Sequence, residues 1–183
     1  MPPYTTLILD EAYTEFAPAT VPMPMEPNHP RVIRMRTFSK AHGMAGMRIG
    51  YVIAHRDLIV GYNKIRNHFG MTRVAMAGAL ASLRDTHFIN DVVAQVEAGR
   101  REYYALAEQL GLASVPSATN FVAIDLGGSG DRARAALQAL EAQGVFVRMP
   151  GVAPMDRCIR VTVGRPEERG RFAEVFSTVL KTL

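Results

Sequence analysis

Short apolar segments with the composition of β-strands alternate along the chain with longer segments that have helical spacing. The elements predicted for the first half are a buried strand at residues 5–9, a loop at 14–30, strands at 31–38 and 48–54 separated by a glycine-punctuated turn at 41–47, and helices at 55–67 and 72–83. This alternation of strands and helices is typical of an α/β fold.

The second half begins with a long amphipathic helix at 88–110, and Gly111 supplies its stop signal. The elements predicted after it are a strand at 120–126, a helix at 131–143, strands at 145–149 and 158–163, and a final helix at 166–183. The order indicates a smaller α+β domain. We therefore divide the chain into domains at 1–100 and 101–183.

The first three predicted strands make a small sheet for an α/β layer, in which parallel strands need cover on both faces. The sequence starts almost directly on a strand, and no upstream segment could shield that strand. We therefore expect that the part of the protein which covers this sheet lies outside the sequence.

Composition excludes several classes of protein. The net charge is +4, but the basic residues are scattered, and the densest group, Arg31, Arg34 and Arg36, has no aromatic ladder beside it. This argues against a nucleic-acid partner and favours small anions. The sequence has no apolar run long enough for a membrane span, and it has a single cysteine, Cys158. Its first residues lack a basic start followed by an apolar stretch, so we expect no signal peptide. We expect a cytoplasmic protein. The five histidines lack metal-ligand spacing.

Five polar residues follow or open predicted strands: Asp10, Tyr13, Ser39, Lys40 and Arg48. Ligands collect beyond the carboxyl ends of strands in open α/β sheets. Singly, each residue has an ordinary explanation as a turn, packing or solvated side chain. Together they match one chemistry, in which a lysine amine forms an imine with an aldehyde cofactor. A carboxylate facing a pyridine nitrogen makes the ring an electron sink, and serine and arginine bind a phosphate.

Two long motifs carry a family resemblance, Leu-Asp-Glu-Ala-Tyr-Thr-Glu-Phe at 9–16 and Arg-Thr-Phe-Ser-Lys-Ala-His-Gly-Met-Ala-Gly-Met-Arg-Ile-Gly-Tyr at 36–51. Two shorter ones lie at 116–121 and 158–164. The chain resembles fold-type I aminotransferases, which use pyridoxal 5′-phosphate (PLP), and among them histidinol-phosphate aminotransferases and their aromatic-aminotransferase relatives. The resemblance covers the C-terminal half of those enzymes. It implies a partial PLP-dependent transferase large domain with a mostly parallel sheet, followed by the smaller domain.

The resemblance also implies roles for the five polar residues. Lys40 would hold PLP covalently and move protons between the substrate Cα and the cofactor. Asp10 would pair with the pyridine nitrogen, and Tyr13 would contact the phenolic oxygen. Ser39 and Arg48 would bind the phosphate. The upstream half of such enzymes normally adds a phosphate-binding turn, an aromatic residue that stacks on the ring, and an asparagine.

Three residues of the second half are candidates for substrate binding. The resemblance implies that Arg160 binds the substrate α-carboxylate and that Arg148 meets a distal anionic group. Strand alternation puts Ile159, Val161 and Val163 on one apolar face and Arg160 on the other, which faces either a cleft or solvent. Asn120 either lines the cleft or satisfies buried backbone groups.

The implied activity is amino transfer between an L-amino compound, histidinol-phosphate-like or aromatic, and a 2-oxo acid such as 2-oxoglutarate. A homodimer, or association with the missing N-terminal half, would complete the enzyme. Two alternatives remain open. The chain could be an inactive truncated relative, or an α/β domain that binds small anions through Arg48, Arg148 and Arg160 without PLP.

Overall fold

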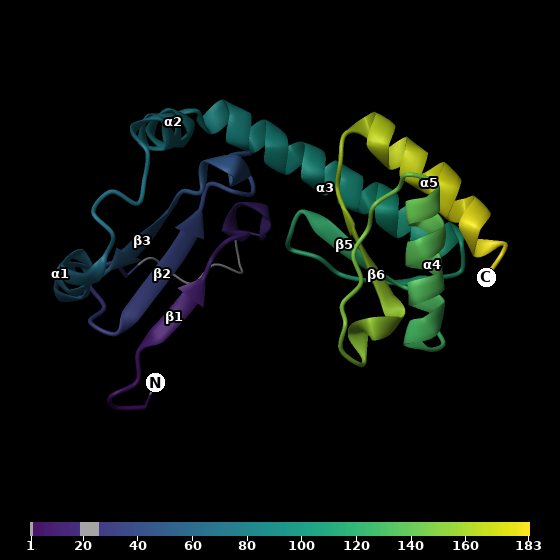
Figure 1. The fold of residues 1–183 in the computed structure, drawn as a ribbon, viewed down its shortest axis with the longest axis horizontal. Helices are drawn as coiled ribbons and strands as arrows, with labels where there is room; N and C mark the ends of the chain where they lie inside the picture. The colour runs from purple at the N-terminus through teal and green to yellow at the C-terminus, as the bar shows by residue number, and fades with distance from the viewer. Residues whose placement is uncertain (1, 19–25) are drawn as a thin grey trace. The chain divides into compact units, whose positions relative to one another are not determined.

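The computed structural model describes residues 2–18 and 26–183, so residues 19–25 of the predicted loop lie outside the described part. The chain forms two compact units, Met1–Val93 and Ala94–Leu183 (Figure 1). The first unit contains strands β1 (Leu7–Asp10), β2 (Val32–Thr37) and β3 (Gly50–Ala54), helices α1 (Arg56–Ile65) and α2 (Arg73–Arg84), and short 3₁₀ turns at Thr14–Phe16 and Ala45–Met47. Helix α3 (Thr86–Gln109) begins in this unit and ends in the second.

The sheet of the first unit has the order β1-β2-β3, with β1 parallel to β2 and β2 antiparallel to β3. Its buried core is small: Phe38 and Ile49 beyond the strand ends pack with Ala75 and Ala79 of α2. Helix α2 starts at Thr72, whose hydroxyl accepts a hydrogen bond from the Ala75 backbone N–H at 3.1 Å. The α/β class predicted for this half is confirmed.

One face of this sheet is largely uncovered, although Ile33 on it is buried, and this corrects the prediction of a buried strand at 5–9. Strand β1 begins two residues later, and its Ile8 side chain is 59% exposed. Met35 and Val52 stand opposite each other on β2 and β3, and both are exposed. The prediction was wrong because an apolar run reports a preference for burial, whereas burial also requires a second surface, which Ile8 lacks in the described part of the chain.

The second unit is an antiparallel sheet covered by helices on one face. Strands β4 (Ala113–Val115), β5 (Phe121–Asp125) and β6 (Cys158–Thr162) lie in that order. The core side chains of the sheet, from Val122, Ile124, Ile159 and Val161, pack against α4 (Gly130–Ala142), α5 (Pro166–Leu180) and the end of α3. Figure 1 shows α4 and α5 beside β5 and β6. A 3₁₀ turn, Met155–Arg157, precedes β6.

Two elements of this unit differ from the sequence predictions. Strand β4 is too short, at three residues, to give a periodic signal. The predicted strand at 145–149 is absent, because this segment pairs with β6 only at a single bridge between Arg148 and Arg160, and Phe146 is 79% exposed. Pro150 and Gly144 at its ends are poor ladder residues, which accounts for the short pairing.

Helix α3 ends where its stop signal predicts. Gly111 adopts a left-handed φ of 69°, a conformation that costs glycine little. Its backbone N–H donates to the Glu108 carbonyl at 3.0 Å. Among the described residues, no helix is both long and apolar enough to cross a membrane.

An ion pair between α3 and α5 stabilises the second unit. The buried Arg169 guanidinium donates to both Glu102 carboxylate oxygens, at 2.7 and 2.9 Å, and to the Gly164 carbonyl at 2.8 Å. This hydrogen bonding lowers the pKa of Glu102. A carboxyl with a lowered pKa in the folded state stabilises it above the unfolded pKa, and that contribution is lost as pH falls through the folded value.

We expect Glu102→Gln to lower the free energy of unfolding by about 1 kcal/mol at pH 7, since the Glu102 side chain is 55% exposed and solvent weakens the pair. The reason is the loss of the carboxylate that faces Arg169. The free energy of unfolding is measured by urea unfolding, followed by circular dichroism, at neutral and acidic pH. The difference from the parent chain should shrink as Glu102 itself becomes protonated, and a difference that grows in acid would contradict this account.

Candidate active site

The carboxyl ends of β1 and β2 meet at one edge of the sheet, because these strands are parallel. Asp10 is the last residue of β1, and Lys40 lies three residues after the end of β2. The Lys40 Nζ atom lies 5.1 Å from the centre of the Tyr13 ring. The Asp10 carboxylate accepts a hydrogen bond from the Ala12 backbone N–H at 3.0 Å. The structure therefore brings Tyr13 and Lys40 together, at the edge where β1 ends in Asp10.

Buried neighbours fix the backbone on both sides of Lys40. Phe38 is 2% exposed and Ala41 1% exposed. His42 is also buried; its ring lies 4.7 Å from the Phe38 ring, and its Nδ1 lies 2.7 Å from the Ser82 hydroxyl of α2. Burial lowers the pKa of His42, which favours the neutral ring. His42 lies in the segment predicted as a turn at 41–47, and the structure makes it an anchor of the Lys40 segment.

Ser39 and Arg48 flank one backbone hydrogen bond. The Phe38 N–H donates to the Ile49 carbonyl at 3.2 Å, which continues the β2–β3 ladder by one step. Arg48 has a left-handed backbone, φ 52°, which costs a residue with a Cβ about 1 kcal/mol. Its exposed guanidinium donates to the Ala45 carbonyl at 2.7 Å. A strained arginine at the end of a hairpin is the type of feature that function maintains.

The basic group on β2 is paired within the protein. The Glu11 carboxylate accepts from Arg34 at 2.6 Å and from Arg36 at 3.1 Å. These two arginines belong to the densest basic group of the sequence, and Glu11 was not among the predicted site residues. The signal available was strand alternation, because Arg34 and Arg36 share a face and Glu11 follows the parallel neighbour. The arrangement binds the ends of β1 and β2 together next to Asp10.

In the second unit, Arg148 and Arg160 stand directly opposite each other. The Arg148 N–H donates to the Arg160 carbonyl at 3.1 Å, and the Arg160 N–H donates back at 2.6 Å. Opposite residues of an antiparallel pair project side by side on one face. Ile159 and Val161 are buried, as the predicted apolar face requires, and Arg160 is half-buried on the other face. Two guanidinium groups on one face favour a ligand with more than one negative charge.

Asn120 is held by its backbone. Its carbonyl accepts a hydrogen bond from the Val163 N–H at 2.8 Å. In residues 2–18 and 26–183, its side chain has no hydrogen bond to a buried backbone group. The structure therefore gives no support to the purely structural explanation of Asn120.

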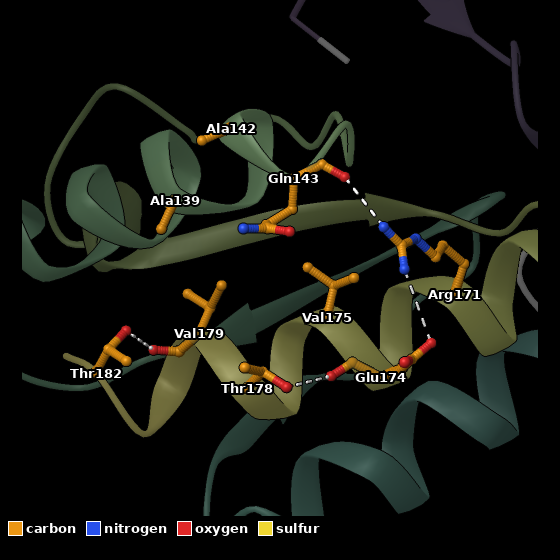
Figure 2. A pocket seen from close by; sticks show the side chains of 9 residues that line it. All are labelled: Ala139, Ala142, Gln143, Arg171, Glu174, Val175, Thr178, Val179 and Thr182. Carbon is orange, nitrogen blue, oxygen red and sulfur yellow. Dashed lines mark hydrogen bonds and ion pairs between the residues drawn. The ribbon is translucent and has the colours of Figure 1, made fainter.

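A cavity of about 470 Å³ lies between α4 and α5 and contains none of the predicted site residues (Figure 2). Arg171 donates to the Gln143 carbonyl at 3.4 Å and lies 3.8 Å from the Glu174 carboxylate. The hydroxyls of Thr178 and Thr182 donate to carbonyls of their own helix turn. Because Arg171, Thr178 and Thr182 all bond to groups of the protein itself, the Gln143 side-chain amide is left as the one polar lining group of this groove, among the described residues, that has no bond drawn in Figure 2.

Comparison with known proteins assigns the family. Residues 5–176 match the family described as aminotransferase class I and II. The chain belongs to the class I and II aminotransferases. It is 37% identical to histidinol-phosphate aminotransferases from Bacillus velezensis and Geobacillus thermodenitrificans, over 98% and 99% of its own length. It also matches the crystal structure of histidinol-phosphate aminotransferase from Sinorhizobium meliloti in complex with pyridoxal-5′-phosphate, with a TM-score of 0.96 and 43% identity over 100% of the chain.

The chain spans about half the length of these aminotransferases, since it covers 50% of each of the three. Class I and II aminotransferases use PLP, and the groups at the edge of the first unit fit that cofactor. The Lys40 amine lies 5.1 Å from the centre of the Tyr13 phenol ring, and the residues that carry a hydroxyl and a guanidinium, Ser39 and Arg48, flank one backbone hydrogen bond. This donor set matches an aldehyde, a ring oxygen and a phosphate.

Proposed function

We propose that this chain supplies the C-terminal part of a PLP-dependent aminotransferase of the histidinol-phosphate type. The observation that carries the proposal is the position of Lys40 Nζ 5.1 Å from the Tyr13 ring, at the edge where β1 ends in Asp10. In the complete enzyme, an amino group would pass between an L-amino compound and a 2-oxo acid such as 2-oxoglutarate. Residues 1–100 would belong to the large cofactor-binding domain, and 101–183 would form the small domain that closes on the substrate.

Each of the five candidate residues of the first unit has a proposed role. Bound PLP supplies an electron sink for chemistry at the substrate α-carbon. Lys40 would hold the cofactor through Nζ and would carry the proton that leaves the substrate Cα. Asp10 would keep a proton on the pyridine nitrogen, and the Tyr13 hydroxyl would donate to the phenolic oxygen. Ser39 and Arg48 would bind the phosphate, the arginine through two parallel N–H groups.

In the second unit, Arg160 and Arg148 would bind the anionic part of the substrate. Arg160 would take the α-carboxylate of an amino acid, and the adjacent Arg148 would add a second guanidinium for a distal phosphate. Asn120 would contribute an amide group to the same substrate. The preferred amino donor is proposed to be an amino-alcohol phosphate such as histidinol phosphate, because a dianion uses both arginines. The product would serve amino-acid biosynthesis, histidine biosynthesis in particular, in the cytoplasm.

The complete enzyme is proposed to be a homodimer, and the uncovered face of the first sheet to bind the half that this chain does not contain. The face is defined by Ile8, Met35 and Val52, and the relatives have about twice the length of the chain. Each of these side chains is already partly covered, so burying the rest of it gives about 1 kcal/mol. We therefore expect this face to bind a polypeptide that has the sequence of the N-terminal half of a relative, which this chain does not match.

Met35→Asp is expected to abolish this association, because a carboxylate would be buried without a partner. The test is co-expression with the half of the Sinorhizobium meliloti enzyme that this chain does not match. One half is captured by an affinity tag, and the amount of the other half recovered with it is measured. The matched control is Phe146→Asp, at a side chain 79% exposed in the second unit, which should leave capture unchanged. Equal capture with both variants would rule out this face, and self-association of the chain alone would assign it to a second copy.

The experiment that tests the proposed function is an absorbance titration with PLP, of the chain alone and of the chain assembled with that half. A visible band from a lysine-bound cofactor, together with amino transfer by the assembly, is the expected result. A band without amino transfer would indicate an inactive relative. An unchanged spectrum of free PLP in both samples would overturn the proposal and leave an anion-binding α/β domain.

A further inference from the structure

The Arg160 guanidinium lies over an aromatic ring. Its Cζ atom is 4.5 Å from the centre of the Phe121 ring, on the neighbouring strand β5. Across the described residues, no carboxylate and no hydrogen-bond acceptor contacts this guanidinium. A ring face attracts a cation without occupying its N–H groups as a carboxylate would. Arg160 is therefore held at one position while its donors remain available to a ligand.

Phe121 is itself fixed by two hydroxyl groups. The Ser117 hydroxyl donates to the Phe121 carbonyl at 2.5 Å, and the Thr119 hydroxyl donates to it at 3.3 Å. The Thr119 hydroxyl also accepts from the Phe121 N–H at 3.3 Å. Both polar backbone groups of Phe121 are thus bonded to the turn that precedes it.

Helix α3 holds that turn in place. Arg100 donates to the Ser117 and Thr119 carbonyls, at 3.0 and 3.2 Å. The Tyr104 hydroxyl accepts from the Ser117 N–H at 2.8 Å. A connected set of hydrogen bonds therefore runs from α3, through the turn, to the residue that carries the ring. Such a set orients a functional side chain at little entropic cost.

We propose that Phe121 is the positioning residue of Arg160. Arg148 stands opposite Arg160 in the same bridge, so the two positive charges repel. A long arginine side chain would respond by moving into solvent, and the ring opposes that movement. The motif at 116–121 thus acts on substrate binding through Arg160 and touches no substrate itself. This inference rests on the proposed role of Arg160 in binding an anion.

The test compares Phe121→Leu with Phe121→Tyr in the full chain. Leucine keeps an apolar side chain and removes the ring, whereas tyrosine keeps the ring. The probe is inorganic phosphate, titrated while the backbone amide resonances of β6 are recorded by NMR. We expect Phe121→Leu to weaken phosphate binding by about fivefold to tenfold, the range of a cation–π contact, and Phe121→Tyr to restore it. Phe146→Leu, at an exposed ring of the same unit, is the matched control and should bind as the parent chain does.

Thermal unfolding of each variant separates positioning from folding. The inference requires that Phe121→Leu binds phosphate more weakly than Phe121→Tyr although the two variants unfold at the same temperature. Equal phosphate affinity in the two variants would overturn it. Arg160→Ala tells the two proposals apart. If that variant binds phosphate as the parent chain does, the anion-binding role of Arg160 fails. If it loses binding while Phe121→Leu retains it, only the positioning role fails.

Discussion

Lys40→Ala is expected to abolish covalent retention of PLP and, in the assembled enzyme, amino transfer. The variant removes the amine that lies 5.1 Å from the Tyr13 ring and leaves the buried anchors Phe38 and His42 unchanged. No neighbouring side chain can replace a primary amine as nucleophile toward an aldehyde. The effect on covalent attachment should therefore be complete, while the fold and any weak phosphate binding at Ser39 and Arg48 remain.

The measurement is borohydride reduction of the PLP-treated protein, followed by mass analysis of the peptides. The sequence has three lysines, and Lys64 and Lys181 are both exposed. They are the matched controls, because free PLP reacts slowly with any exposed amine. The expected result is a modified peptide that contains Lys40, absent from Lys40→Ala and present in Lys64→Ala. Equal modification of all three lysines would show that Lys40 has no cofactor site around it.

The α/β character and the candidate edge could be predicted from the sequence because local signals specify them. Short apolar runs ended by polar residues gave β2 and β3, and Gly111 gave the end of α3. The approach of Lys40 to Tyr13, at the edge where β1 ends in Asp10, followed from one rule about parallel strands. These features depend on residues near in sequence, or on a topology with few alternatives.

Features that depend on what covers a surface could not be predicted. The run at 5–9 has the composition of a buried strand, yet Ile8 is 59% exposed, because burial also requires a second surface. The pairing of Glu11 with Arg34 and Arg36 could be predicted only from the register of β1 against β2. A shift of one residue would turn both arginines to the opposite face of the sheet. The bridge between Arg148 and Arg160 also depends on register. The segment at 145–149 has the composition of a strand but pairs with β6 only at this bridge, so composition alone could not locate it.

Arg160→Ala is expected to weaken the binding of a dianion by about 100-fold, since it removes charge-assisted hydrogen bonds worth roughly 2–3 kcal/mol. Arg148→Ala should cost about tenfold, because solvent screens its exposed guanidinium more strongly. Inorganic phosphate titrated into the chain, and the substrate KM of the assembled enzyme, both measure the loss. Arg134→Ala, at a guanidinium 62% exposed on α4, is the matched control for the change of net charge.

The size of the loss and its salt dependence together decide between the two interpretations of the Arg160 face. If this face binds the substrate, affinity should fall with ionic strength in the parent chain and much less in Arg160→Ala. If the face is only solvated, Arg160→Ala and Arg134→Ala should lower phosphate affinity equally and slightly, through net charge. Because Phe121 already holds the guanidinium at 4.5 Å without a carboxylate partner, its immobilisation costs little on binding. That preorganisation is why a loss well above the control is the expected outcome.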